Sequence, residues 1–425
     1  MRVGIGILGG GTVGGVLARK LLEDREAIAA KAGIDLELVK VAVRDPARAR
    51  PFPSGYLSTR PEEVVADPAV DLVVELLGGL EPARSLVLQA LDLGKPVVTA
   101  NKELVAADGP ELFQRAAARG VSLLFEAAVG GGIPLIRPLS ESLAGERLTR
   151  VLGIVNGTTN YILTSMSQDG TTYPEALAEA QRLGYAEADP TADVGGGDAA
   201  AKAAILGALA FGVWIGSDRV YREGIEAIDV RDLDYAADLG YAVKLLAVAE
   251  ASGGGVAVRV HPALVPDDHP LAGVRGANNA VFIEGRSVGE LLFMGPGAGG
   301  EPTATAVLGD VIDASRELLA GAQVAPRIQF GGGSIIDFAE IPTKWYLRLQ
   351  VTDAPGVLAQ IAGVFGEHGV SLMSVWQEGR GEEATLLLVT HDAPERSQRQ
   401  AVAALRELAS VRQVAATIRV VAAEP

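Results

Sequence analysis

Several absences narrow the chemistry open to this chain before any motif is considered. The 425 residues include no cysteine, which excludes disulfides, zinc–thiolate sites and cysteine nucleophiles. The longest apolar stretch, around 203–215, is shorter than the roughly 20 residues that a membrane-spanning helix needs. The first residues lack the charged region, long apolar core and cleavage site of a signal peptide. We therefore expect a cytoplasmic enzyme whose chemistry uses no thiol.

Positive charge is also scarce in this sequence. The chain carries 37 lysines and arginines against 53 acidic residues, which gives a formal net charge of -16. Nucleic acids and anionic membranes both require basic patches, so we expect neither as a partner and interpret the acidity as a solvated surface. Apolar residues make up 48% of the chain, which favours a well-packed globular protein. The length suggests about two to four domains.

The first third of the chain alternates short apolar runs with helical patterns. The runs that indicate strands lie at 3–8, 36–43, 70–77, 96–99 and 121–125. The helical patterns between them lie at 12–22, 81–91 and 111–119. Alternation of this kind predicts a parallel, doubly wound α/β sheet of the Rossmann type.

The middle of the chain, roughly 138–300, is less regular and predicts an α+β domain. A long alanine-rich helix is expected from about Asp198, and alternating residues indicate strands at 256–260 and 281–283. The glycine run at 295–300 precedes a further predicted helix at 303–319.

The last part of the chain restarts with a pattern of its own. Glycine and proline dominate 326–343, which predicts a linker. A strand at 345–351 is followed by a helix that ends at His368 and by two strands at 370–377 and 383–390, joined by a turn at 379–381. A helix at about 395–408 and a strand at about 413–421 complete the pattern. This βαββαβ order is the ferredoxin-like arrangement. The predicted domains are 1–137 with about 301–328, 138–300 and 344–422, with the linker at 329–343.

A glycine motif near the N-terminus predicts a dinucleotide site. Gly9-x-Gly11-x-Val13-Gly14 follows a predicted strand and opens a predicted helix. The glycines allow a tight turn and a close approach of the backbone to a pyrophosphate, which the N–H groups of the helix start can bind. Alone, such a motif is weak evidence for a dinucleotide site. Its place between a strand and a helix favours that site over the alternative, an ordinary glycine-rich turn.

The end of the second predicted strand bears on the choice of cofactor. An acid that binds the ribose hydroxyls is usual there, but here Arg44 follows the strand and Asp45 comes one place later. An arginine at this point suits a 2′-phosphate, so we expect NADP(H) to be preferred, with NAD(H) possible. The alternative is that Arg44 pairs with Asp45 or with another surface acid.

Acids and a lysine gather in the glycine-rich middle segment. Asp198 and Lys202 lie four apart and so share one face of a helix, with Glu187 and Asp193 just upstream. Acids near a lysine can bind a substrate ammonium and orient the lysine as a proton donor to an alkoxide. A solvated ion pair of little consequence is the alternative, and spacing alone does not decide between the two.

Two further segments follow predicted strands of the parallel sheet. Lys102 comes directly after Thr99-Ala-Asn101, at the carboxyl end of a strand, where ligands bind in such sheets. Its alternative is a surface lysine. The run from Glu126 to Pro134 has an irregular glycine backbone whose carbonyl oxygens could face a hard cation, although the residues alone favour a flexible crossover. The four histidines show no ligand spacing.

One long pattern resembles a known family. It is Ala180-x3-Gly184-Tyr185-Ala186-x2-Asp189-Pro190-x2-Asp193-Val194-x-Gly196-x-Asp198-x3-Lys202, which resembles the homoserine dehydrogenase signature in full and at the right spacing. Other segments that resemble family motifs occur in the same order: Gly9 to Gly14, Thr99-Ala-Asn-Lys102, Glu126 to Pro134, Asn156-Gly-Thr-Thr-Asn160 and Gly295-x-Gly-Ala-Gly299. The resemblance covers about residues 1–320, and the tail resembles an ACT domain.

The resemblance implies a role for each matching position. Lys202 would be the proton donor, with Asp198 and Lys102 as the other catalytic residues and Lys102 between cofactor and substrate. The substrate site would contain Glu187, Asp198, Asp193, Tyr185 and Lys102. The cofactor would be bound by Gly9, Gly11, Thr12, Val13, Gly14, Lys102, Gly184 and Gly299, with Arg44 added from the argument above. A sodium ion would be held, mostly through backbone oxygens, by Glu126, Val129, Gly131 and Ile133.

The resemblance also implies an activity and a form of regulation. The reaction would be the reversible reduction of L-aspartate 4-semialdehyde to L-homoserine, in a homodimer or homotetramer formed through the middle domain. In the tail, Asp353-x-Pro-Gly356-Val-Leu would be the ligand-side turn, with backbone groups near a helix start available for a carboxylate. The implied effector is L-threonine. A tail that only dimerises is the alternative.

The sequence argues against three other functions. A phosphorylating semialdehyde dehydrogenase needs a cysteine for its thioester, and the chain has none. A fused aspartate kinase is excluded because no residues remain for a kinase domain. A non-catalytic sensor of amino acids and nucleotides stays as the alternative from another class, although the intact acid and lysine set argues against it.

Overall fold

The structure is a computed structural model that describes residues 2–321, 328–379 and 384–421. By its internal contacts the chain divides into two compact units. The first unit comprises Met1–Leu148, Ala204–Arg219 and Gly285–Gly332, and the second comprises Thr149–Ala203, Val220–Glu284 and Gly333–Pro425. Most of the turn predicted at 379–381 and the predicted domain end at 422 lie outside the described residues, and the domain limits stay predictions. Among the described helices none is long and apolar enough to cross a membrane.

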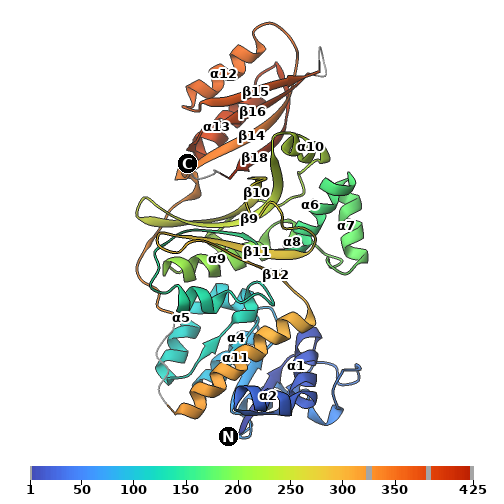
Figure 1. The fold of residues 1–425 in the computed structure, drawn as a ribbon, viewed down its shortest axis with the longest axis vertical. Coiled ribbons are helices and arrows are strands. Elements are labelled where there is room, and N and C mark those ends of the chain that lie inside the picture. The colour runs from blue at the N-terminus through green and yellow to red at the C-terminus, as the bar shows by residue number, and fades with distance from the viewer. Residues whose placement is uncertain (1, 322–327, 380–383, 422–425) are drawn as a thin grey trace. The chain divides into compact units, whose positions relative to one another are not determined.

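The first unit contains a six-stranded parallel sheet (Figure 1). Its strands are β1 (Arg2–Leu8), β2 (Asp35–Ala42), β3 (Leu57–Ser58), β4 (Leu72–Glu75), β5 (Val97–Thr99) and β6 (Leu123–Leu124). They run in the order β3-β2-β1-β4-β5-β6, and each recorded pair is parallel. The strand order reverses beside β1, which is where such sheets bind dinucleotides. The predicted doubly wound fold is confirmed.

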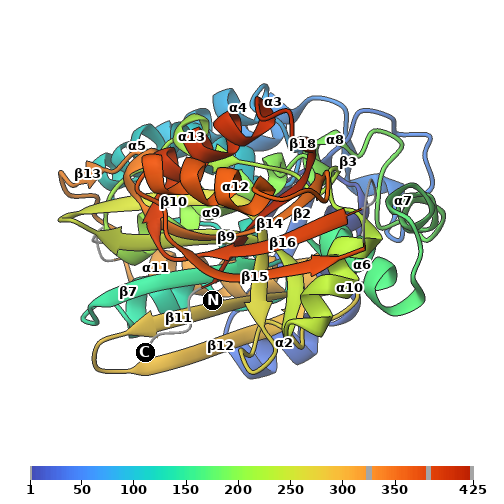
Figure 2. The same cartoon turned by 90° about the horizontal axis from the view of Figure 1, so that it is seen from above.

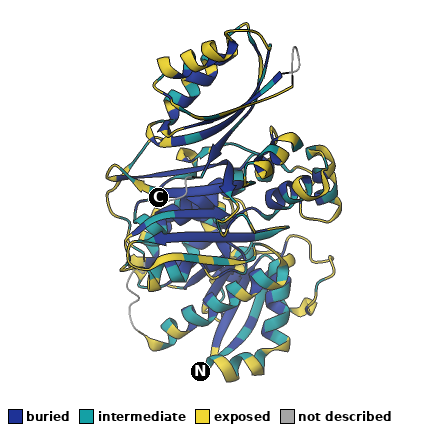
Figure 3. Ribbon diagram, turned by 45° about the horizontal axis from the view of Figure 1, so that its top comes forward, coloured by how far each residue is buried: buried dark blue, intermediate teal, exposed yellow. Residues whose placement is uncertain are grey.

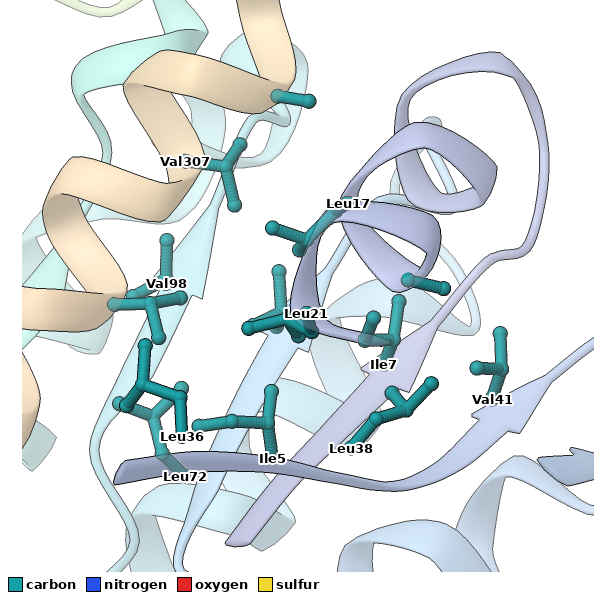
Figure 4. Packing of buried hydrophobic residues seen from close by; sticks show 14 of the residues in the cluster. Ile5, Ile7, Leu17, Leu21, Leu36, Leu38, Val41, Leu72, Val98 and Val307 are labelled. Atoms are coloured by element: carbon teal, nitrogen blue, oxygen red, sulfur yellow. The ribbon is translucent and has the colours of Figure 1, made fainter. Parts of the chain in front are cut away.

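Helices cover both faces of this parallel sheet. They are α1 (Thr12–Glu23), α2 (Arg25–Ala32), α3 (Pro61–Ala66), α4 (Ala83–Asp92), α5 (Lys102–Arg119) and α11 (Gly300–Ala320). Successive strand residues point to opposite faces, so Val74 packs into the core under α1 and α11 while Val73 packs into the core under α3, α4 and α5. Figure 4 shows Leu17 and Leu21 of α1 with Val307 of α11 over the strand side chains.

The second unit contains a mixed sheet and the helices that carry the acid–lysine pattern. Its first strands are β7 (Leu148–Ile154), β9 (Tyr241–Ser252), β10 (Gly255–Pro266) and β11 (Asn278–Gly285), and β12 (Gly289–Pro296) follows them in the chain. The helices are α6 (Gly157–Asp169), α7 (Tyr173–Arg182), α8 (Thr191–Val194), α9 (Gly197–Phe211), whose last residues belong to the first unit, and α10 (Val230–Asp238). Strands β7, β9, β10 and β11 are buried along most of their length (Figure 3).

The C-terminal part of the second unit has the predicted βαββαβ order. Its elements are β14 (Pro342–Val351), α12 (Val357–Glu367), β15 (Leu372–Glu378), β16 (Ala384–Thr390), α13 (Glu395–Arg406) and β18 (Val411–Val420). The strands lie in the order β18-β14-β16-β15. Figure 2 shows α12 and α13 together over one face of these strands, where Ile361 and Leu405 join the buried core. The ferredoxin-like prediction is confirmed.

The outer edge of β10 is covered by three short parallel pairings. β13 (Ser334–Ile335) pairs at Gly255, β8 (Tyr221–Arg222) pairs at Arg259, and β18 pairs at Ala263. The sheet of the middle part therefore continues into the C-terminal sheet.

The remaining short elements are η1 (Ser54–Tyr56), η2 (Glu126–Ala128), η3 (Pro138–Ser142), η4 (Ser217–Arg219), η5 (Phe338–Glu340) and β17 (Ala393–Pro394). Of the short elements, β13 and η5 lie in the stretch predicted as a linker.

Candidate active site

The glycine turn after β1 has the geometry that a dinucleotide needs. Gly9 adopts φ +106°, a left-handed conformation that favours glycine. A Cβ on Gly14 would lie 1.9 Å from the carbonyl oxygen of Gly9, so only glycine fits where the helix start approaches the turn. A Cβ on Gly11 would meet nothing within 4 Å, which leaves the approach to the N-terminus of α1 open. The backbone N–H groups there fit a pyrophosphate.

We expect Gly14→Ala to disrupt this turn. The added methyl group collides with backbone, which cannot rotate away, so the free energy of unfolding should fall by about 1–3 kcal/mol and cofactor binding should weaken. Thermal unfolding and NADPH fluorescence titration measure the two effects. Gly11→Ala is the matched control, because its Cβ has room and its φ is −80°, so its melting temperature should stay at the wild-type value. Wild-type behaviour of Gly14→Ala in both measurements would contradict this account of the turn.

The loop after β2 is tied to the glycine turn by an arginine that sequence reasoning missed. Arg50 donates from Nε to the carbonyl oxygen of Gly10 at 3.1 Å. It also donates from Nη2 to the carbonyl oxygen of Asp45 and from Nη1 to that of Arg48, each at 2.8 Å. Arg44 is exposed at the start of this loop. Arg50 therefore holds the loop that carries Arg44 against the predicted cofactor turn.

A buried acid organises the carboxyl ends of β4 and β5. Glu75 is fully buried and accepts hydrogen bonds from Leu77 N at 2.7 Å and Thr99 Oγ1 at 2.5 Å. Burial raises the pKa of this carboxyl, and the hydrogen bonds oppose that rise in part. Asn101 caps α5 through Leu104 N and donates to the carbonyl oxygen of Gly79 at 2.6 Å. These contacts fix the strand end from which the half-buried Lys102 starts α5.

The segment predicted to hold a cation offers mainly backbone oxygens. The carboxylate of Glu126 accepts from the backbone N–H groups of Leu135, Ile136 and Arg137 at 2.5 to 3.0 Å. Gly130 and Gly131 adopt φ of +76° and +56°, which coils the chain tightly at this point. No group of three acid or histidine side chains that could hold a metal occurs among the described residues. Carbonyl oxygens suit a hard cation, so the segment fits sodium without its carboxylate.

In the second unit, Lys202 and Asp198 form a buried pair rather than a solvated one. Nζ of Lys202 lies 2.7 Å from Oδ2 of Asp198, and the lysine is only 9% exposed. The same Nζ donates to the carbonyl oxygen of Val155 at 2.7 Å. The i,i+4 spacing placed both residues on one face of α9, as expected. A charged lysine held by two acceptors in a buried place is suited to proton transfer.

Two polar side chains from the start of α6 complete this cluster. Asn156 donates from Nδ2 to Asp193 Oδ1 at 2.7 Å and to Asp198 Oδ2 at 2.8 Å. Thr158 donates to the carbonyl oxygen of Tyr185 at 2.7 Å and lies 3.2 Å from Asp193 Oδ2. Both residues stand in the segment Asn156 to Asn160 that resembles a family motif, so the sequence did mark them. From sequence alone, this segment has no assigned role in the site.

The other predicted substrate residues lie on the exposed turn after α7. Gly184 adopts φ +80°, and the ring of Tyr185 packs against that of Tyr161 with their centroids 4.9 Å apart. Glu187 is exposed, and its carbonyl oxygen accepts from Gln181 Nε2 at 3.1 Å. Gly299 belongs to the first unit, where it caps α11 with φ +123°. The recorded bonds thus join Lys202 directly to Asp198, and they link Asp198 to Asp193 through Asn156, but none of them includes the side chain of Glu187.

Comparison with known proteins assigns the family. The model for homoserine dehydrogenase matches residues 134–312, that for its NAD binding domain matches 9–126, and that for the ACT domain matches 345–410. A homoserine dehydrogenase of Corynebacterium glutamicum is 45% identical over 98% of this chain and 95% of its own length. The chain belongs to the homoserine dehydrogenase family. One from Pseudomonas aeruginosa is 42% identical over 98% of both chains.

Solved structures of homoserine dehydrogenases agree with this assignment. The enzyme from Thiobacillus denitrificans is 43% identical, with a TM-score of 0.94 over 99% of this chain and 98% of its own. A hyperthermophilic archaeal homoserine dehydrogenase, solved in complex with NADPH, is 32% identical, with a TM-score of 0.62 over 75% of this chain and 98% of its own. The chain is therefore an NAD(P)-dependent oxidoreductase with a C-terminal ACT domain, and the sensor alternative is not favoured. The roles of single residues stay predictions.

Proposed function

We propose that this chain catalyses the reversible reduction of L-aspartate 4-semialdehyde to L-homoserine, with NADPH as the preferred cofactor. The observation that carries the proposal is the buried cluster of Lys202, Asp198, Asp193 and Asn156 in a chain of the homoserine dehydrogenase family. A lysine held by an acid and a carbonyl oxygen is the kind of group that aldehyde reduction needs as a proton donor.

In this mechanism the residues of the chain bind the substrate and move one proton. A dinucleotide held at the glycine turn would supply the hydride for the aldehyde carbon. An ammonium has three N–H donors, and in the described part of the chain Lys202 gives two of them to Val155 and Asp198. We assign the third to the substrate oxygen, which Lys202 protonates. Asp198 pairs with Lys202 and orients it, and with Asp193, Glu187 and Tyr185 it contacts the amino-acid end of the substrate.

Lys102 and the glycine-rich segments complete the proposed site. We propose that Lys102 lies between cofactor and substrate, and that Gly184 and Gly299 lie near the nicotinamide. The pyrophosphate would be bound at Gly9, Gly11, Thr12, Val13 and Gly14. A sodium ion held by the carbonyl oxygens of Glu126, Val129, Gly131 and Ile133 would stiffen the neighbouring backbone. We further propose a cytoplasmic homodimer or homotetramer that assembles through the middle domain.

A direct assay tests the proposed activity. The purified full chain is mixed with NADPH and L-aspartate 4-semialdehyde, and absorbance at the NADPH band is followed. Absorbance should fall only when the semialdehyde is present, and L-homoserine should accumulate in equal amount. If neither NADPH nor NADH is oxidised, the chain is a sensor and the proposed activity is wrong.

The proposed cofactor preference predicts the behaviour of Arg44→Ala. Loss of a guanidinium that pairs with the 2′-phosphate should raise KM for NADPH by about tenfold or more and leave KM for NADH unchanged. Steady-state kinetics with both cofactors measures this difference. Arg115→Ala is the control, since Arg115 is an arginine of α5 that pairs with Asp92 at 2.7 Å. An NADPH preference that survives Arg44→Ala would show that Arg44 does not contact the phosphate.

The proposed effector predicts that L-threonine inhibits the enzyme at millimolar concentration or below. Asp353 precedes the start of α12 and accepts from Gln377 Nε2 at 3.1 Å, in the turn that would bind an amino acid. Asp353→Ala should raise the half-maximal threonine concentration about tenfold without changing kcat. Asp392→Ala, an exposed aspartate of the same domain, should respond as wild type. A flat titration of the wild type would leave the ACT domain as a module for dimerisation only.

A further inference from the structure

The connection between β7 and α6 contacts the Lys202 cluster at two successive residues. The carbonyl oxygen of Val155 accepts from Lys202, and the amide of Asn156 donates to Asp193 and Asp198. Asn156 is 5% exposed, so these contacts are shielded from water. Oδ2 of Asp198 accepts from both Lys202 Nζ and Asn156 Nδ2, at 2.7 and 2.8 Å. Two donors on one oxygen fix the direction in which that carboxylate points.

The side-chain oxygen and both N–H groups of Asn156 each have a hydrogen-bond partner. Its Oδ1 accepts from Thr159 N at 2.9 Å and so caps α6. That bond requires the oxygen to face the helix, which turns the NH2 group toward the acids. The two N–H groups then match the two acceptors on Asp193 and Asp198. The helix start therefore sets the orientation of the donor that the catalytic acids share.

Charge explains why a neutral donor is needed at this position. Asp193 and Asp198 both lie within hydrogen-bond distance of one nitrogen, so their carboxylates repel each other. The N–H groups of Asn156 offset this repulsion without adding a charge that would compete with Lys202. An aspartate here would add a third acid, and a lysine would add a second cation.

We propose that Asn156 is a positioning residue for the proton transfer: its amide bridges Asp193 and Asp198, and through Asp198 it holds Lys202 in the geometry for protonating the substrate oxygen. The inference rests on the proposed function of Lys202 as proton donor. In this proposal Asn156 acts through the acids and the lysine.

The test separates the bridge from the helix cap. Serine caps helices as well as asparagine does, but its hydroxyl is too short to reach both acids. In Asn156→Ser, kcat should fall on the order of 10²-fold because the donor is displaced, while KM for NADPH and the melting temperature stay near wild type. The solvent isotope effect of D2O on kcat should rise, because protonation then limits the rate. A role in folding alone would not raise that isotope effect.

Two further variants complete the experiment. Asn156→Asp keeps the cap and places a third carboxylate among the acids, so its kcat should fall further than that of Asn156→Ser. Asn160→Ser is the matched control, since Asn160 also lies in α6 but donates to the carbonyl oxygens of Gly276 and Asn278. It should lower the melting temperature and leave the isotope effect unchanged.

The outcomes distinguish this inference from the function on which it rests. If the wild type does not oxidise NADPH with the semialdehyde, the proposed function itself fails. If the wild type is active, and folded Asn156→Ser and Asn156→Asp keep kcat within about threefold with an unchanged isotope effect, Asn156 is not a positioning residue. If Asn156→Ser does not fold, the Asn156→Asp result decides, since aspartate keeps the cap and removes the shared donor.

Discussion

Lys202→Met should lower kcat by about 10²–10⁴-fold, the range that a positioned proton donor contributes. Methionine keeps the length and apolar stem of the side chain in a place where lysine is only 9% exposed, so packing changes little. NADPH affinity should change much less than kcat, because the recorded contacts of Lys202 are with Val155 and Asp198. Stopped-flow or steady-state kinetics and NADPH fluorescence measure the two quantities.

A second buried lysine provides the control for this experiment. Lys244 of β9 is 4% exposed and donates to the carbonyl oxygen of Val274 at 2.5 Å. Lys244→Met therefore removes a buried ammonium from the same unit without touching the acid cluster. It should affect thermal stability as Lys202→Met does, yet keep kcat within a few fold of wild type. Near-normal turnover of folded Lys202→Met would refute its assignment as proton donor.

Arg348→Met should lower the free energy of unfolding by about 3–5 kcal/mol, the usual cost of leaving a buried charge without its partner. Arg348 of β14 donates from Nε and Nη2 to the two carboxylate oxygens of Asp232 in α10, at 2.6 and 2.9 Å. The arginine is 3% exposed and the aspartate is fully buried. Urea unfolding followed by circular dichroism gives the difference, and the enzyme should unfold at a lower urea concentration.

The partner substitution shows whether the unpaired charge is the cause. Arg348→Met combined with Asp232→Leu removes both charges, and the double variant should recover most of the lost stability. Arg182→Met serves as the surface control, since Arg182 pairs with Glu179 while its side chain is 68% exposed, and its effect should stay below about 1 kcal/mol. A double variant as unstable as Arg348→Met would mean that shape, and not charge, matters at this position.

Local patterns were enough to predict the parallel sheet of the first unit and several of its helices, but not β3, α2 or α3. The apolar runs and the glycine turn determine a parallel sheet because each strand must be buried on both faces. The helix predicted at 111–119 in fact begins at Lys102 and contains Pro110. Gly109 and Pro110 are unfavourable inside a helix, yet α5 continues through both of them. Tertiary packing explains the glycine, because a Cβ on Gly109 would lie 2.1 Å from the ring of Trp214.

Contacts between residues far apart in the chain were not predictable in the same way. β9 was not predicted, because its alanines and leucines are typical of a helix. It forms a strand because β10 pairs with it along twelve residues. In the site, the spacing of Asp198 and Lys202 was informative because both lie on one helix. Asn156 lies 42 residues from Asp198, and a polar residue before a helix predicts only a cap. Glu75 was missed for a similar reason.

The three short pairings along β10 also bear on how the chain avoids self-association. A strand of twelve residues with a bare edge would offer unpaired N–H and C=O groups to any neighbouring polypeptide, which is how edge-to-edge aggregation begins. Here β13, β8 and β18 each occupy a few residues of that edge. Because β18 follows β10 by more than a hundred residues in the chain, this part of the edge is covered only after β18 has been synthesised. The domain that carries the proposed control site therefore also covers part of the edge of β10 in the folded chain.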